Sequence, residues 1–476
     1  MPRSLSPGLA EPIRPDELDG LFAPLLDVGR PVPSALAVAL AVSGGSDSTA
    51  LMVLFAEWLR GAGREPSQHT VLTVDHGLRE QSAAEAQGVA AQAHGLGYRH
   101  ATLVWHGAPH AGVQAAARAA RYRLMGAYMR AHGIALLLTA HTREDQAETL
   151  LMRLARGSGL DGLTAMAPIT DLAEVAADHA LEPAELALAR PMLGLPKARL
   201  VATLEARGIT WVEDPSNQSP AHERSRLRAA KAQLDALGLT DAMLALSAGR
   251  LRRARAAIEE AVAQFCRGSH GAVHVDPCGY VTVDRGRLQR VEAEIALRVL
   301  GRAIAAASGS DQPVPLAKLE AIVEALRSAD PAGTAKWTLA RAMITAKGGA
   351  IIIEREPGRE PLPRLTMAAG EKELWDGRFR VGISPDFAGG PVEVSALGSA
   401  EAGRLLRQDA DASHVPAGIA AMVPCFRRGD RLIAVPPLNH WANPCCRAHL
   451  RAEFTGMNTP ARAFSWRRGA GGLETS

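Results

Sequence analysis

The chain has 476 residues, more than one hydrophobic core usually organises, so two or three domains are expected. Hydrophobic residues make up 47% and charged residues 22%, which excludes a disordered or fibrous chain. The formal net charge of +3 is too small to identify a nucleic-acid partner, so the distribution of charge along the chain matters more than its sum.

The cysteines and the apolar runs exclude further classes. The 5 cysteines include no C-x-x-C pair, and their odd number argues against a disulfide framework or a structural zinc site. Residues 1–30 lack the apolar segment of a signal peptide. The longest apolar run, residues 35–42, is too short to span a bilayer. We therefore expect a cytoplasmic protein with no membrane partner.

The first part of the chain alternates apolar runs with helical patterns. A buried strand is predicted at residues 35–42, and further strands at 70–74, 101–105 and 134–139. Helices are predicted at about residues 50–59, 82–94, 113–131 and 144–154. Fully apolar strands that alternate with helices are typical of a parallel sheet covered on both faces. The sequence therefore predicts an α/β fold with a doubly wound parallel sheet.

The later part of the chain changes in character. Residues 171–188 are acidic and alanine-rich, and we predict a surface excursion there, either an exposed helix or a loop. A short strand and a helix are expected between this segment and the turn-forming residues 214–217, which suggest a boundary. An arginine-rich helical pattern begins at about residue 224. Helices and short strands follow, and a proline-rich linker is predicted at 356–364. The predicted domains are residues 1–225, 226–355 and 365–476.

The residues most informative about chemistry are Ser43-Gly-Gly-Ser-Asp-Ser48, which follow the first strand and open a helix. Two glycines permit positive φ and close backbone approach, and the free N–H groups of the turn and helix N-terminus attract an anion. Asp47 would repel a bound phosphate unless a cation such as Mg²⁺ intervened. The alternative is an ordinary Ser/Gly turn. A Walker-type loop is excluded because its lysine is absent.

This turn resembles the pyrophosphate-binding loop of the ATP pyrophosphatase (PP-loop) superfamily. The resemblance assigns ATP binding to Ser43, Gly44, Gly45, Ser46, Asp47 and Ser48. Further segments resemble the ordered signatures of tRNA(Ile)-lysidine synthetases, at residues 74–79, 114–122, 139–149, 153–159, 190–193, 213–217 and 224–228. The resemblance covers roughly residues 35–230. The C-terminal half matches only in general layout.

The resemblance implies a ligase that joins L-lysine to carbon 2 of the wobble cytidine of tRNA(Ile) with a CAU anticodon. ATP and Mg²⁺ are implied, with an adenylated cytidine as the intermediate and AMP and pyrophosphate as products. Residues 1–225 would form the PP-loop catalytic domain, 226–355 a helical or α+β tRNA-binding domain, and 365–476 a small α+β domain. The sequence is also compatible with a homodimer.

Three candidate catalytic residues, His141, Asp145 and Glu148, are spaced i, i+4 and i+7 after the fourth strand. They would share a helix face if the helix reached back to residue 141. Such a cluster suits capture of a lysine ammonium and transfer of its protons. The alternative is a solvated helix face with an N-terminal cap. By the resemblance, Arg121 would bind phosphates or the activated intermediate, and Arg118 is a weaker candidate.

Two positions depart from the family pattern: Thr142 and Glu144 stand where a second histidine and an aspartate are usual. Glu144 keeps the charge but reaches farther. The arginines at residues 224–228 and 250–255 suggest a surface for tRNA phosphates, or else an ion-paired helix face. Two other functions are considered: tRNA thiolation, disfavoured because residues 1–225 contain no cysteine, and a non-catalytic RNA-binding protein, disfavoured by the intact loop.

Overall fold

The computed structural model describes most of the chain. The described residues are 10–26, 37–75, 82–105, 113–176, 186–212, 223–267, 271–310, 314–330, 333–358, 361–408, 412 and 414–457. The described residues divide into two compact units, one that ends at Arg255 and one that begins at Ala256. The division into three domains stays a prediction. No helix in the described ranges has both the length and the apolar character needed to cross a membrane.

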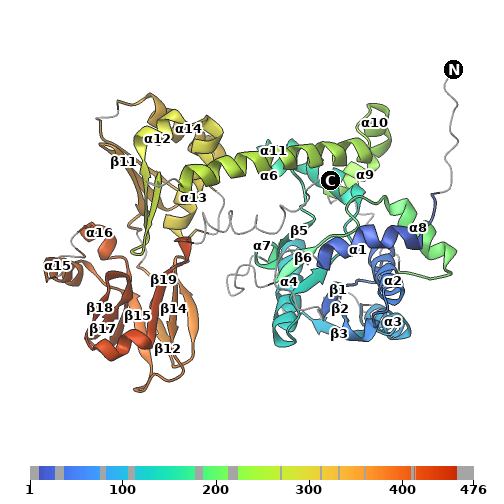
Figure 1. Ribbon diagram of the computed structural model, residues 1–476, viewed down its shortest axis with the longest axis horizontal. Coiled ribbons are helices and arrows are strands. Elements are labelled where there is room, and N and C mark those ends of the chain that lie inside the picture. Colours follow the sequence, from blue (N-terminus) through green and yellow to red (C-terminus); the bar gives the residue numbers. More distant parts are fainter. Residues whose placement is uncertain are drawn as a thin grey trace. The chain divides into compact units, whose positions relative to one another are not determined.

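The first unit contains a six-stranded sheet (Figure 1). Its strands are β1 (Val38–Ala41), β2 (Thr70–Asp75), β3 (Arg99–Val104), β4 (Leu136–Leu138), β5 (Ile169–Asp171) and β6 (Ala187–Ala189). Its main helices are α1 (Leu18–Leu26), α2 (Ser46–Gly61), α3 (Ser82–Gly95), α4 (Val113–Ala131), α5 (Arg143–Ala155), α6 (Leu160–Leu163), α7 (Leu172–Ala176) and α8 (Lys197–Ala206). Helices α9 (Glu223–Ala229) and α10 (Lys231–Ala236) follow, and then α11 (Asp241–Arg267), which passes from the first unit into the second.

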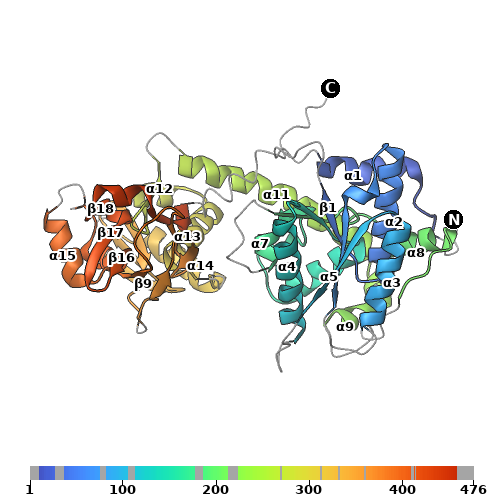
Figure 2. The same ribbon diagram turned by 90° about the horizontal axis from the view of Figure 1, so that it is seen from below.

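The strand order is β3-β2-β1-β4-β6-β5, and every neighbouring pair is parallel except β5 with β6. Side chains alternate across the sheet: Val38 and Leu40 join one core cluster, and Ala39 joins another. Helices α2 and α3 lie on one side of the sheet and α4 on the other (Figure 2). The predicted doubly wound α/β fold is confirmed. Chain order reverses between β1 and β4, so this is the switch point where such sheets bind ligands.

Residues 171–188 were predicted to form a surface excursion, and the described part of this segment differs from that prediction. Residues 177–185, and the predicted turn at 214–217, lie outside the described part of the chain. However, Leu186 to Ala189 are buried, and β6 pairs with β4 inside the sheet. Strand β6 has three residues and follows an acidic, alanine-rich stretch, so neither its length nor its context distinguished it from a loop. The prediction of a surface segment was wrong at both described ends, because Asp171, Leu172 and Ala176 are buried as well.

The second unit is built from antiparallel sheets and a few helices. One sheet has the order β7-β8-β11-β10-β9, a second β12-β15-β16-β17-β18 and a third β13-β14-β19. The strands are β7 (Val273–Asp276), β8 (Tyr280–Asp284), β9 (Ala335–Leu339), β10 (Ala342–Lys347), β11 (Ala350–Arg355), β12 (Leu365–Met367), β13 (Lys372–Trp375), β14 (Phe379–Ile383), β15 (Val392–Ala396), β16 (Pro424–Arg428), β17 (Arg431–Val435), β18 (His440–Trp441) and β19 (Leu450–Phe454). The helices are α12 (Arg285–Arg290), α13 (Ala293–Ser308), α14 (Leu316–Ser328), α15 (Ser399–Gln408) and α16 (Ala417–Ala420). The expected helical and α+β character of this half is confirmed.

Candidate active site

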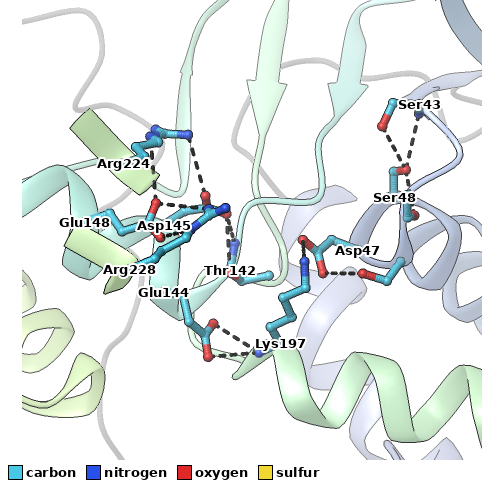
Figure 3. Close-up of polar contacts among 12 residues, drawn as sticks. Ser43, Asp47, Ser48, Thr142, Glu144, Asp145, Glu148, Lys197, Arg224 and Arg228 are labelled. Atoms are coloured by element: carbon cyan, nitrogen blue, oxygen red, sulfur yellow. Dashed lines mark hydrogen bonds and ion pairs between the residues drawn. The ribbon is translucent and has the colours of Figure 1, made fainter. Parts of the chain in front are cut away.

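The glycine turn lies between β1 and α2, at the switch point of the sheet. The Ser43 N–H donates to Ser48 Oγ at 3.2 Å, and the Ser43 and Ser48 hydroxyls lie 3.3 Å apart (Figure 3). Gly45 is the N-cap of α2 and has no side chain to satisfy the first N–H groups of the helix. These donors and the positive end of the helix dipole can therefore bind an anion.

Gly44 is required by the backbone of this turn. Its φ of +87° lies in the left-handed region, which side chains with a Cβ rarely adopt. A Cβ at this position would also lie 3.1 Å from Cγ2 of Val89 on α3. The Gly44 carbonyl accepts the Val212 N–H at 2.8 Å, which fixes the turn against the chain that follows α8.

Asp47 lies in the first turn of α2 and points across the site toward α8 (Figure 3). Its Oδ2 is 3.2 Å from Nζ of Lys197, the first residue of α8, and its Oδ1 accepts the Ser46 hydroxyl at 3.2 Å. Burial raises the pKa of the Asp47 carboxyl, and the Lys197 ammonium opposes that rise. The loop carboxylate is thus matched by a cation from a distant part of the sequence.

Helix α5 begins at Arg143, so His141 precedes it and the shared helix face predicted from the spacing does not form. Thr142 is the N-cap, and both its N–H and its hydroxyl donate to Asp145 Oδ2, at 2.9 and 3.3 Å. The bond from the N–H of the N-cap residue to a side chain three positions later is one half of a capping box. Asp145 therefore caps α5, as the alternative to a catalytic role predicted. Its other oxygen, Oδ1, lies 3.7 Å from Nη1 of Arg224.

Glu148 is buried, and its carboxylate is held by two arginines from α9. Nε and Nη2 of Arg228 donate to its two oxygens at 2.6 and 3.2 Å, and Nε of Arg224 is 3.8 Å away. Burial raises the pKa of Glu148, and the bond from Arg228 opposes that rise. The sequence predicted Arg224 and Arg228 as part of a basic surface, but their guanidinium groups face the acidic end of α5.

A pocket of about 320 Å³ unites these elements within the first unit. One part of its wall carries the carboxylates, and another is formed by leucines from α5 and from the segment α9 to α11. Its lining includes Asp47, Glu144, Asp145, Glu148, Leu151, Lys197, Leu227, Arg228, Leu234, Leu239 and Leu244. An apolar wall next to a group of carboxylates suits a ligand with an aliphatic stem and a cationic end.

Two of the predicted catalytic residues, His141 and Arg121, are not among the residues that line this pocket, and of the turn at residues 43–48 only Asp47 lines it. Nδ1 of His141 is 3.0 Å from the Thr139 hydroxyl, and burial lowers the pKa of the ring to about 4. Arg121 is half-buried on α4, and burial lowers its pKa. Arg118 is exposed on the same helix, with its guanidinium 5.2 Å from the Tyr122 ring centre.

The arginines at 250–255 separate into two kinds. Arg252 donates to the carbonyls of Thr164 and Met166, at 3.1 and 2.8 Å, so it holds α11 against the loop after α6. Arg255 pairs with Asp161 at 2.7 Å. The ion-paired alternative therefore applies to this part of the cluster. Arg250 and Arg253 are exposed.

Sequence reasoning missed Lys197, although one signal was present. A lysine in the first turn of a helix is unfavourable because the positive end of the helix dipole lies there. The Pro196 N-cap marks that helix start in the sequence, and Lys197 follows it directly. A cation at such a place suggests an anionic partner elsewhere in the fold, which proves to be Asp47.

Comparison with known proteins agrees with this geometry. The family model of the PP-loop domain matches residues 20–233. A tRNA(Ile)-lysidine synthase of Bradyrhizobium diazoefficiens is 44% identical over 73% of this chain and 96% of that protein. The chain belongs to the tRNA(Ile)-lysidine synthase family.

Two further relatives of the same name support this assignment. The protein of Methylobacterium sp. strain 4-46 is 43% identical over 76% of this chain and 99% of its own length. That of Ruegeria pomeroyi is 36% identical over 83% and 87%. The family predicted from the sequence, with its ATP-binding PP-loop domain, is confirmed. These matches do not favour the thiolation and non-catalytic alternatives.

Proposed function

We propose that this chain joins L-lysine to carbon 2 of the wobble cytidine of tRNA(Ile) with a CAU anticodon, and that it does so in the cytoplasm. ATP first adenylates oxygen 2 of the cytosine, and pyrophosphate leaves. The lysine ε-amine then attacks carbon 2, and AMP departs with that oxygen. The observation that carries the proposal is the anion-binding turn beside an acidic, leucine-walled pocket, in a member of this family.

The turn of residues 43–48 would hold the diphosphate of ATP. Its N–H groups and hydroxyls supply donors, and Gly44 leaves the backbone open to close approach. Asp47 fits a magnesium ion, because its carboxylate is one hard oxygen ligand and the phosphates of ATP supply others. When bound, Mg²⁺ would neutralise the charge that develops on the departing pyrophosphate.

The pocket would take the lysine side chain. Its aliphatic stem fits the leucine wall, formed in part by Leu227, Leu234 and Leu244, and its ammonium fits the carboxylates of α5. In the structure the Arg228 guanidinium is hydrogen-bonded to the Glu148 carboxylate. Binding of the lysine ammonium to this carboxylate displaces the guanidinium. The acidic end of the pocket thus binds a cation in both states, first from the protein and then from the substrate.

The attacking amine must first lose a proton, because lysine is cationic at neutral pH. Glu148 is the best of the three acceptors predicted from the sequence, since burial raises the pKa of its carboxyl. His141 is a poorer base, because burial lowers its pKa to about 4. Asp145 caps its own helix and holds the end of α5 in place. Arg121 keeps its proposed role toward phosphates or the activated intermediate.

The experiment measures transfer of labelled lysine to a tRNA(Ile) transcript with a CAU anticodon, in the presence of ATP and Mg²⁺. We expect ATP-dependent incorporation by the wild-type protein and a rate at least about a thousand-fold lower in Asp47→Ala, on the scale of losing electrostatic stabilisation of a leaving group. A transcript with uridine at the wobble position is the matched control. Wild-type rates in Asp47→Ala would refute the role of the turn.

A further inference from the structure

Lys197 lies between the two halves of the site, although it comes from a helix that neither half uses. Its Nζ is 3.2 Å from Asp47 Oδ2, on the side of the diphosphate turn. Its backbone N–H donates to both carboxylate oxygens of Glu144 on α5, at 3.1 and 3.0 Å. One residue therefore connects the carboxylate of the turn with the helix that carries Asp145 and Glu148 (Figure 3).

Hydrogen bonds in both directions join the starts of α5 and α8, and together they form an anchor between the two helices. The N–H of Arg143 donates to the Leu195 carbonyl at 3.0 Å, while Glu144, the next residue, accepts the Lys197 N–H. The carboxylate of Glu144 also lies at the N-terminus of α8, where the helix dipole favours an anion. These bonds fix the first turn of α8, and with it the origin of the Lys197 side chain.

The anchor gives the unusual glutamate at position 144 a physical role. Aspartate is shorter by one methylene, a bond of about 1.5 Å. From the same backbone position its oxygens would lie too far from the Lys197 N–H for hydrogen bonds of this length. Thr142 completes the arrangement, since it caps α5 and so sets where that helix begins.

We propose that Lys197 binds the phosphates of ATP and that Glu144 is a positioning residue that holds it there. Without nucleotide, the Lys197 ammonium neutralises Asp47. When ATP arrives with its cation, Asp47 turns to the cation and the ammonium moves to the nearest phosphate oxygens. The side chain of Lys197 is half-exposed, with a relative exposure of 51%, so it has room for this movement. This inference rests on the proposed function, because it assumes that the turn holds ATP.

The test measures binding of the ATP analogue α,β-methylene-ATP to the full chain by calorimetry, without turnover. Lys197→Met is expected to raise the Kd about 10-fold or more, the range of a lost hydrogen bond between charged groups. Lys197→Arg is expected to restore most of the affinity. Glu144→Gln and Glu144→Asp are expected to weaken analogue binding by a few-fold when Lys197 is present, and to have little further effect in the Lys197→Met background.

The control is Arg199→Met on the same helix. Arg199 pairs with Glu17, away from the pocket, so its replacement tests whether merely loosening α8 affects nucleotide binding. Wild-type affinity in Lys197→Met overturns the inference, and so does weakening in Arg199→Met equal to that in Lys197→Met. Wild-type affinity in both Glu144 variants overturns the positioning role of Glu144. If Lys197→Met loses the analogue while the wild type transfers no lysine to tRNA, the inference stands and the proposed function fails. If the wild type transfers lysine normally and Lys197→Met binds the analogue with wild-type affinity, the inference fails and the proposed function stands.

Discussion

Gly44 is the residue on which the conformation of the turn at residues 43–48 depends most. Its positive φ and its close approach to Val89 both exclude a side chain. Gly45 differs, because its φ of −72° is ordinary and the nearest atom to a Cβ there is the Ser43 hydroxyl oxygen, 3.9 Å away. Gly44 is therefore required for its backbone conformation, whereas Gly45 contributes only its small size.

Gly44→Ala is expected to destabilise the first unit by about 1–2 kcal/mol, because the left-handed conformation strains any residue with a Cβ. Binding of the ATP analogue should fall with it, since a relaxed backbone would turn the N–H groups away from the diphosphate. Gly45→Ala serves as the control and should change stability by less than about 1 kcal/mol. Equal stability of the two variants in thermal unfolding would contradict the conformational requirement at Gly44.

At the scale of elements, the sequence predicted the parallel core well because its signals are local. The apolar runs of β1, β2, β3 and β4 lie within the predicted ranges or close to them, and α4 matches at both ends. The short strand expected after residue 188 lies slightly earlier, as β6. Strand β5 was not predicted, since its sequence, Ile-Thr-Asp, has one apolar residue and no apolar run. The order of the strands depends on contacts between residues that are far apart in the sequence. Local patterns in one sequence do not reveal such contacts.

The site shows the same limit. Asp47, Asp145 and Glu148 were predicted from local motifs, and the structure brings them to one pocket. Lys197 and Arg228 reach that pocket from residues far along the chain, and only their pairing with carboxylates reveals them. The proposed sharing of a helix face by His141 failed because Thr142 caps the helix after it, a detail set by one hydrogen-bonded residue.

The element β1 contains a pH-dependent contact. The N–H of Val38 donates to Nδ1 of His69, which is buried beside Phe55, and burial lowers the pKa of His69 to about 4. The unfolded value is near 6.5, so between these values the unfolded chain binds a proton that the folded chain does not. Stability contributed by neutral His69 is therefore complete above about pH 6.5 and is lost as the pH falls toward 4, by at most about 3 kcal/mol.

His69→Gln keeps an acceptor for the Val38 N–H but cannot titrate. We expect this variant to be less stable than wild type at pH 7.5 and the difference to shrink at pH 5. The measurement is the opening free energy of the β1 amides, obtained from hydrogen exchange at the two pH values. A difference between variant and wild type that does not change with pH would exclude His69 as the titrating group.

At the scale of the whole molecule, the arginines of α11 differ in whether they contact the rest of the first unit or are exposed. Arg252 and Arg255 are engaged with the chain around α6, whereas Arg250 and Arg253 are exposed. Under the proposed function the exposed pair contacts tRNA phosphates. Such contacts add affinity that depends on salt but carry little sequence information.

Replacing Arg250 and Arg253 by glutamine is expected to weaken tRNA binding. The slope of log K against log salt should become shallower by about 1 for each tRNA phosphate that the variant no longer binds. Lysine transfer at saturating tRNA should remain close to wild type, because neither residue lines the pocket. Filter binding at several salt concentrations measures the slope. An unchanged slope in the double variant would place the tRNA-binding surface elsewhere on the chain.

The central claim is that the turn between β1 and α2 holds the diphosphate of ATP, beside a pocket that delivers an amine. A crystal structure with bound α,β-methylene-ATP and Mg²⁺ tests it most directly. We predict phosphate oxygens within hydrogen-bond distance of the N–H groups of residues 43–48, with the cation at Asp47. Nucleotide bound at another place, with this turn still closed on itself, would contradict the claim.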